Sequence, residues 1–158
     1  MIKTKKRIYT GIVTGTETVR MRRYIHQIPT EDGEILLMTR KVPVDNRQRG
    51  SVLLVHGLAQ NRFSWTLSGR SLENYLVSQG FETFNVELRG HGLSRAIGGD
   101  YPETFETYLD YDIPAILERV TALTRGKKVF YIGHSLGGTI AYWFRNREAG
   151  PMLRLLSH

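Results

Sequence analysis

The chain has 158 residues, of which 41% are hydrophobic, enough to bury the core of one domain and too many for a disordered protein. It contains no cysteine, so disulfides, a thiol nucleophile and thiolate metal sites are excluded. The net charge is +7, but +6 of it belongs to residues 1–23, and the remaining residues are nearly balanced. We therefore expect no nucleic-acid partner.

Residues 1–21 form a basic, threonine-rich start, which we interpret as a solvated leader. An alternative role for this segment is attraction to an anionic lipid surface or a polyanion. It lacks the apolar stretch that a signal peptide requires, and no apolar run in the chain approaches the length of a membrane span. The sequence therefore predicts a soluble, cytoplasmic protein without an integral membrane segment.

Regular patterns begin near residue 22 with a predicted hairpin. Two strand-like runs, residues 23–29 and 34–42, are separated by Asp32-Gly33, a strong hairpin signal. The rest of the chain alternates between short apolar runs and stretches with helical spacing. The predicted elements are, in order, strand 51–57, a helix from Ser68 or Ser71 to Gly80, strand 81–88, helix 109–120, strand 128–132, helix 136–147 and a short strand at 152–156.

Local signals refine two of the predicted helices. The apolar stripe expected on the first helix consists of Leu72, Tyr75 and Leu76. The second has Asp112 as a candidate cap and Pro114 in its first turn. Residues 89–104, between this helix and the preceding strand, are interpreted as a long glycine-bearing loop.

The alternation of strands and helices indicates an α/β fold with a mostly parallel sheet and an antiparallel hairpin in front. We expect helices on both faces of this sheet. The sequence contains no internal repeat, low-complexity tract or linker, so residues 22–158 are assigned to a single domain.

Residues 133–137 read GHSLG, a G-x-S-x-G pattern between a predicted strand and a predicted helix. So tight a turn holds the serine in a strained backbone conformation and lifts its hydroxyl above the sheet. Side chains at Gly133 and Gly137 would collide with neighbouring backbone. The helix directs its free N–H groups toward the place where an oxyanion would develop. This pattern favours Ser135 as a nucleophile; the alternative is that Ser135 only caps the helix.

A second candidate element, His56-Gly57, ends the first parallel strand. Gly57 allows a backbone turn that presents the N–H of Leu58 to the same oxyanion. We interpret His56 as a structural residue that is hydrogen-bonded within the loop, rather than as a general base.

Three segments, VLLVHGLAQN, NVELRGHGLS and VFYIGHSLGG, resemble the α/β-hydrolase superfamily in their order and spacing. The resemblance extends over about residues 22–147, and within the superfamily the chain is similar to the lipase and esterase branches, including the acid-lipase-like enzymes. It implies Ser135 as the nucleophile and the N–H groups of Leu58 and Leu136 as the oxyanion hole.

The resemblance also implies roles for other polar residues. His91 belongs to a loop that shapes the fold, and His134 packs beside the nucleophile. Neither stands at the position of the family's catalytic histidine. Asp110 and Asp112 do not match its catalytic acid.

In this family the acid and the histidine follow the nucleophile along the chain. After Ser135 the sequence contains one carboxylate, Glu148, and one histidine, His158. We interpret Glu148 as surface charge, and His158 would have to fold back from the chain end. Complete domains of this type have about 200–250 residues. We therefore interpret the chain as an incomplete α/β-hydrolase domain, truncated after the nucleophile-elbow helix.

The leading functional hypothesis is a lipase- or esterase-like serine hydrolase of carboxylic esters, present as its N-terminal half. Its partners would be a small-molecule or lipid ester and a complementing C-terminal polypeptide. The alternatives are an acyltransferase of the same fold and a non-catalytic remnant or interaction module. The sequence has no phosphate loop, metal-ligand cluster or dinucleotide fingerprint, so no metal or other cofactor is predicted.

Overall fold

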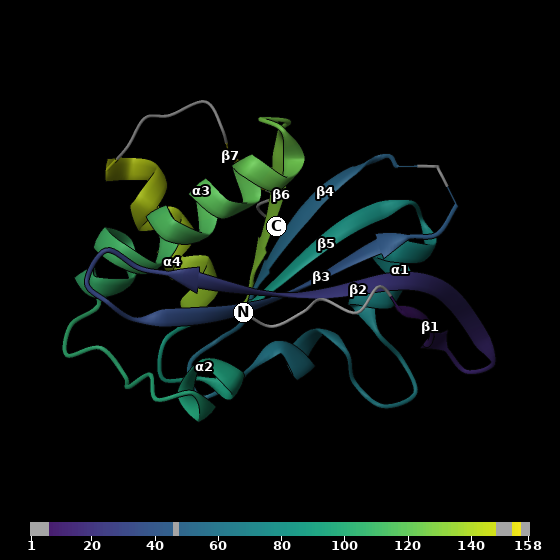
Figure 1. Cartoon of the computed structure of the whole chain (residues 1–158), viewed down its shortest axis with the longest axis horizontal. Helices are drawn as coiled ribbons and strands as arrows, with labels where there is room; N and C mark the ends of the chain where they lie inside the picture. The colour runs from purple at the N-terminus through teal and green to yellow at the C-terminus, as the bar shows by residue number, and fades with distance from the viewer. Residues whose placement is uncertain (1–6, 46–47, 148–152, 156–158) are drawn as a thin grey trace.

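A computed structural model describes residues 7–45, 48–147 and 153–155 of the chain (Figure 1). These residues form one seven-stranded sheet with the strand order β1-β2-β3-β5-β4-β6-β7. The strands are β1 (Arg7–Thr14), β2 (Glu17–Pro29), β3 (Ile35–Pro43), β4 (Gly50–Val55), β5 (Phe81–Glu87), β6 (Val129–Gly133) and β7 (Leu153–Leu155). The helices are η1 (Arg62–Trp65), α1 (Leu72–Ser78), α2 (Gly92–Ala96), η2 (Tyr108–Asp112), α3 (Ile113–Thr124) and α4 (Leu136–Arg147).

The predicted hairpin is confirmed as the antiparallel pair β2–β3. Its turn is closed by the hydrogen bond from the Thr30 N–H to the Glu34 carbonyl, 2.9 Å long. The Thr30 hydroxyl donates to the Asp32 carboxylate at 2.5 Å, and Gly33 has a φ of 94°. A side chain at this left-handed position would be strained, which explains the strength of the Asp-Gly signal.

The structure differs from the sequence expectation at residues 7–21, which were assigned to a solvated leader. They form β1 and the start of β2, which pair antiparallel; this adds one strand, β1, to the sheet and lengthens β2. Val13 and Met21 are buried on the face toward α1. The backbone pairing of β1 with β2 and the burial of these two side chains, rather than the local charge, decided the structure.

The centre of the sheet is parallel. β4 pairs in parallel with both β5 and β6, and β5 is antiparallel to β3. One face carries the main core under α3 and α4 (Figure 1). Its buried side chains include Leu36, Met38, Leu53, Val55, Phe84, Val86, Val129, Tyr131, Ile116 and Ile140. The alternate residues of β4 and β6 point to the other face, so both faces are covered as predicted for a parallel sheet.

On the face toward α1 the predicted apolar stripe is wrong in part. Leu72 and Tyr75 are 42% and 48% exposed, and the helix instead buries Glu73 and Asn74 together with Val77. The sheet presents polar side chains here, so the polar side of α1 faces it. Lys41 Nζ donates to Glu73 Oε2 at 2.8 Å and to Asn74 Oδ1 at 2.9 Å. Ser71 caps this helix by accepting the Asn74 N–H, one of the two predicted caps.

Two helical segments lie where the sequence prediction was incomplete. The expected loop 89–104 contains the short helix α2, and a π-helical turn, η2, leads directly into α3. Pro114 stands in the first turn of α3 as predicted. The Asp112 side chain does not cap that helix, because both carboxylate oxygens are bonded to Arg89.

The last part of the fold follows the prediction. β6 leads into α4, whose bounds agree with the predicted helix. β7 pairs in parallel with β6, with Leu153 opposite Val129 and Leu155 opposite Tyr131. The ends of the predicted strand, Met152 and Leu156, lie outside the described residues. Within the described ranges, no helix combines the length and apolarity needed to cross a membrane.

Candidate active site

Ser135 lies in the sharp turn between β6 and α4, with its side chain exposed and its φ at 49°. Left-handed backbone is unfavourable for a non-glycine residue and is found where surrounding structure imposes it. Here the surrounding structure is close packing. A Cβ at Gly133 would lie 2.5–2.6 Å from backbone atoms of Gly137 and Gly138, and one at Gly137 would overlap the Val55 carbonyl. The predicted collisions at both glycines are therefore confirmed.

The turn at Ser135 is anchored to the sheet from two sides. The His134 N–H donates to the Val55 carbonyl at 3.1 Å, which ties the turn to the end of β4. The Tyr131 hydroxyl, buried beneath the turn, donates to the Gly137 carbonyl at 2.8 Å. Burial raises the pKa of Tyr131, so this donor stays protonated. These contacts hold Ser135 at the carboxyl end of the parallel strands.

The second loop of the site is the turn Gly57–Gln60, which follows β4. The Gln60 N–H donates to the Gly57 carbonyl at 3.2 Å, and the left-handed residue is Ala59, with a φ of 57°. Gly57 was expected to supply the backbone freedom for this turn, but its role is space. A Cβ there would lie 2.8 Å from Gln60 Oε1 and 3.0 Å from His134 Nδ1.

Three of the four N–H groups in this turn have partners. Gly57 donates to Gln60 Oε1 at 3.0 Å, Ala59 donates to His91 Nε2 at 3.2 Å, and Gln60 closes the turn. Within the described residues, the N–H of Leu58 donates to no acceptor. The same is true of the N–H of Leu136 in the first turn of α4, where such groups are free by geometry.

Two buried histidines hold this loop to the one after β5. His56 contacts the Gly57 carbonyl through Nδ1 and accepts the Leu88 N–H through Nε2. His91 contacts the Arg89 carbonyl through Nδ1 and accepts the Ala59 N–H through Nε2. Each ring therefore carries its proton on Nδ1. Burial lowers the pKa of His56 to about 4 and also lowers that of His91, which keeps both rings neutral. These contacts agree with the sequence-based interpretation of His56 and His91 as structural residues.

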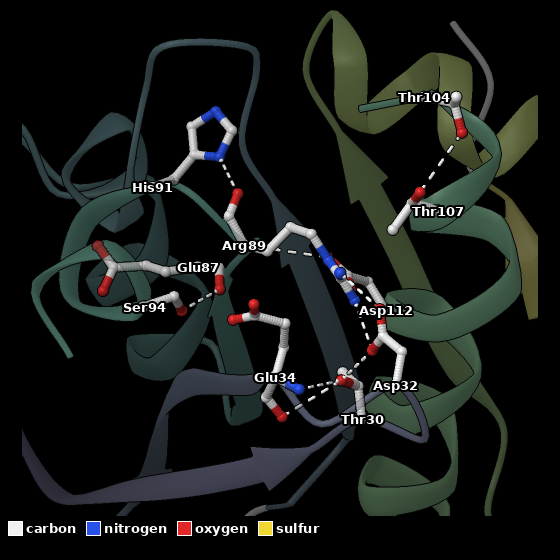
Figure 2. A network of polar contacts seen from close by, with 10 residues as sticks. All are labelled: Thr30, Asp32, Glu34, Glu87, Arg89, His91, Ser94, Thr104, Thr107 and Asp112. Atoms are coloured by element: carbon white, nitrogen blue, oxygen red, sulfur yellow. Dashed lines mark hydrogen bonds and ion pairs between the residues drawn. The ribbon is translucent and has the colours of Figure 1, made fainter. Parts of the chain in front are cut away.

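Below these loops, Arg89 joins three segments of the chain (Figure 2). Its guanidinium contacts Asp112 Oδ1 at 2.6–2.7 Å and Asp32 at 2.7 and 3.0 Å. Hydrogen bonds from Arg89 lower the pKa of Asp32. Burial raises the pKa of Asp112 to about 6 in spite of the same partner, because Asp112 is fully enclosed. The hairpin tip, the RGHG loop and the start of α3 are thus fixed to one another.

A second buried carboxylate orders the neighbouring loop. Glu87 receives two bonds from the Arg62 guanidinium, at 2.9 and 3.0 Å, and the Leu93 N–H at 2.9 Å. Its own carbonyl accepts the Ser94 hydroxyl at 2.5 Å (Figure 2). A Cβ at Gly92 would overlap this carboxylate. Glu87 is therefore committed to holding η1 and α2 in place.

The described residues bring no acid–histidine pair to Ser135. No described side chain hydrogen-bonds to its hydroxyl. Asp110 is exposed and pairs with Arg147 at 2.9 Å. The remaining candidates, Glu148 and His158, lie outside the described residues. In the same part of the chain, no group of three or more histidine or acidic side chains is arranged to hold a metal ion.

Sequence reasoning missed the contacts that hold the two loops together. The polar residues involved are Gln60, Glu87, Arg89, Asp32 and Asp112. The partners that join the loops, such as His134 for Gln60, lie more than twenty residues away, so no local spacing signals them. One signal was available for Glu87: it is a carboxylate in a predicted parallel strand, and because such strands are buried on both faces it calls for a partner.

Three features define an α/β-hydrolase: an open mixed sheet whose strands β5, β4, β6 and β7 are parallel, a serine in a strained strand–helix turn, and the loop after β4 beside that turn. The family model described as serine aminopeptidase, S33, matches residues 46–155, so the chain belongs to this α/β-hydrolase family, as its resemblance implied.

Comparison with known proteins finds that the chain is similar to lipases. It is 33% identical to triacylglycerol lipase 2 of Arabidopsis thaliana, over 74% of this chain and 32% of that protein. It is 35% identical to human lipase member J, over 74% of this chain and 36% of that protein. The chain thus spans about a third of the length of these curated relatives.

Solved structures agree with the fold. An esterase from Pyrococcus furiosus superposes with a TM-score of 0.65 at 21% identity, covering 92% of this chain and 55% of that one. A thermostable carboxyl esterase from Bacillus coagulans superposes with a TM-score of 0.67 at 19% identity, covering 84% and 43%. The α/β fold is therefore as predicted, and the partial coverage of these two enzymes agrees with an incomplete form of it.

Proposed function

We propose that this chain is the N-terminal part of a serine hydrolase of carboxylic esters, with Ser135 as its nucleophile. One observation carries the proposal: an exposed serine at a φ of 49° between β6 and α4. Strain of this kind costs about 1–3 kcal/mol and persists where the surrounding structure maintains it. A serine that only capped α4 would lie in ordinary extended backbone, as Ser71 does at the start of α1.

The two free N–H groups support an oxyanion hole. Leu58 and Leu136 are the residues that the family resemblance assigns to this role, and neither N–H is used by a described acceptor. The other amides of the turn after β4 are already bonded, so Leu58 is the donor left for a ligand. Donors of this kind, held in place before the reaction, lower the energy of the developing charge.

The reaction would proceed by acyl transfer. The Ser135 oxygen attacks the ester carbonyl carbon while a base takes the hydroxyl proton, and the carbonyl electron pair moves onto oxygen as the oxyanion. The intermediate collapses, the C–O bond to the alcohol breaks, and the alcohol leaves with the proton from that base. Water then attacks the carbonyl carbon of the acyl-serine while the base takes a proton from the water. The bond between the acyl carbon and the Ser135 oxygen breaks, the acid is released, and the base returns the proton to the serine hydroxyl.

The base and its supporting acid would come from polypeptide beyond this chain. The curated relatives are about three times longer than the matched region, which leaves room for both groups. Tyr142 and Trp143, on the helix that follows Ser135, are 62% and 51% exposed, as expected for side chains that such a polypeptide would cover. The relatives are named as lipases, which favours an ester substrate, in particular a lipid ester.

Covalent labelling of Ser135 with a fluorophosphonate tests the proposal. The chain is treated alone and together with the downstream segment of a full-length relative, and the modified residue is identified by peptide mass spectrometry. We expect slow labelling alone and faster labelling with the segment, because the oxyanion hole without its base retains only about 10³–10⁴-fold of acceleration over water. Ser135→Ala removes the labelled peptide, whereas Ser68→Ala, at an exposed serine, leaves it unchanged. Labelling at other serines to the same extent, with or without the segment, would reject Ser135 as the nucleophile.

A further inference from the structure

We propose that Gln60 is a positioning residue that sets the spacing between the two oxyanion donors. The effect of Gln60 on catalysis rests on the proposed function, whereas the hydrogen-bonded bridge itself is tested separately. Gln60 ends the turn after β4, and its side chain reaches across to the turn that carries the nucleophile. It is a direct side-chain connection between these two loops.

One oxygen makes the connection. Gln60 Oε1 accepts the Gly57 N–H at 3.0 Å and lies 3.0 Å from His134 Nδ1. A Cβ at residue 57 would fall within 2.8 Å of Oε1 and 3.0 Å of the same imidazole nitrogen. Gly57 therefore leaves the space that lets the glutamine bridge the two loops.

The proton positions follow from this geometry. An amide oxygen only accepts hydrogen bonds, and the Gly57 N–H identifies the bridging atom as that oxygen rather than the amide nitrogen. His134 must then donate from Nδ1, so its ring carries a proton on that nitrogen. Both acceptor positions of Gln60 Oε1 are filled, and the bridge is complete without water.

The bridge restrains the backbone that carries the two donor N–H groups. Leu58 follows Gly57, and Leu136 is two residues after His134, so the two donor N–H groups are carried by the bridged backbone. A glutamine holds them without adding charge. A carboxylate at this position would accept the same two bonds, but its negative charge would oppose an oxyanion nearby.

The structural test uses the isotopically labelled full chain and nuclear magnetic resonance. In the native protein the His134 imidazole nitrogens should show the Nδ1–H tautomer, and the Gly57 amide should be protected from hydrogen exchange. In Gln60→Ala both features are lost, and Gly57 exchanges about five- to tenfold faster, the expected effect of one hydrogen bond. The matched control is Gln79→Ala, because Gln79 is exposed and, among the described residues, its side chain hydrogen-bonds only to the adjacent Ser78. An unchanged tautomer and exchange rate in Gln60→Ala would overturn the proposal.

The catalytic test uses Gln60→Ala, which removes both hydrogen bonds of the bridge and adds no charge. Fluorophosphonate labelling of Ser135, in the presence of the complementing segment, should slow by roughly tenfold, because the two donor N–H groups are no longer held in place. A merely structural glutamine would leave this rate unchanged, and that result would overturn the positioning role. If Gln60→Ala disrupts the bridge but Ser135 is unreactive in every variant, the bridge stands and the proposed function fails.

Discussion

His56 and His91 lie with their ring centroids 4.7 Å apart, and each accepts a backbone N–H from the loop that carries the other. The pair joins the loop after β4 to the loop after β5, and these two strands are neighbours in the sheet. Both rings act as acceptors at Nε2, so protonation of either one would replace a hydrogen bond by a repulsive contact between two donors. The neutral form of both rings is therefore part of the fold.

The first prediction concerns pH. Burial lowers the pKa of His56 from 6.5 to about 4, lowers that of His91, and, together with Arg119 and Arg40, lowers that of His26 to about 4. Between about pH 6.5 and pH 4 the unfolded chain therefore binds more protons at these histidines than the folded protein does. The free energy of unfolding should therefore fall as the pH falls through this range, by about 1 kcal/mol per pH unit for each such histidine.

Asp112 works in the opposite direction. Its pKa is raised to about 6 by burial, so the folded protein binds its proton first and recovers part of the loss below that pH. Urea unfolding at several pH values measures the balance. His56→Gln should lower stability near neutral pH and weaken its dependence on pH. A stability that is constant or rises on acidification of the native protein would contradict the role given to the histidines.

The second prediction separates the Leu58 N–H from the Leu58 side chain. Leu58 is the second residue of a turn whose third residue is left-handed, and proline is favoured at such a position. Leu58→Pro should keep the melting temperature but lower Ser135-dependent ester hydrolysis by the complemented protein by about 10²–10³-fold, because one oxyanion donor is removed. Leu58→Ala retains the N–H and should remain active. Equal activity in the two variants would exclude Leu58 as a donor.

The third prediction compares two adjacent glycines. A Cβ at Gly137 would overlap backbone of Val55, whereas at Gly138 its nearest neighbour would be 3.6 Å away. Gly137→Ala should destabilise the protein by about 3 kcal/mol or more, because backbone must move. Gly138→Ala, within α4, should stabilise it by about 0.5–1 kcal/mol through helix propensity. Chemical denaturation of both variants measures the contrast, and similar effects at the two sites would contradict the packing described for the turn.

The fourth prediction compares a buried with an exposed ion pair. Arg89→Met leaves the enclosed Asp112 without its partner and should lower the free energy of unfolding by about 3–5 kcal/mol. Arg147 and Asp110 are 44% and 52% exposed at their side chains. Arg147→Gln should therefore change stability by less than about 1 kcal/mol. The difference in denaturation midpoint between the two variants is the readout, and a tolerated Arg89→Met would show that Asp112 has another way to be neutralised.

Much of the fold was predictable because it depends on local patterns. The Asp32-Gly33 turn, the Ser71 cap and α4 all follow from residues adjacent in sequence. The strained conformation of Ser135 was also expected, since GHSLG stands between a strand and a helix and both flanking glycines are needed for close packing. The assignment of Ser135, Leu58 and Leu136 to catalysis stays a prediction.

The failures have a common physical cause. Residues 7–21 were assigned to a leader because of their charge, and only the pairing of β1 with β2 makes strands of them. The stripe on α1 was placed on Leu72 and Tyr75 because its apolar side was expected to face the sheet, but this part of the sheet carries Lys41 and other polar groups. Each outcome depended on a partner that the local sequence does not contain.

The sequence by itself determined the order of strands and helices, the class of fold and the position of the strained serine, because periodicity, glycines and caps act over a few residues. The tertiary structure decided which polar groups are satisfied and by what. The contacts of Gln60 with His134, His91 with Ala59, and Arg89 with both Asp32 and Asp112 join segments more than twenty residues apart. Such contacts form only when the sheet has brought its loops together, since a buried polar group is bonded to whatever the fold places beside it.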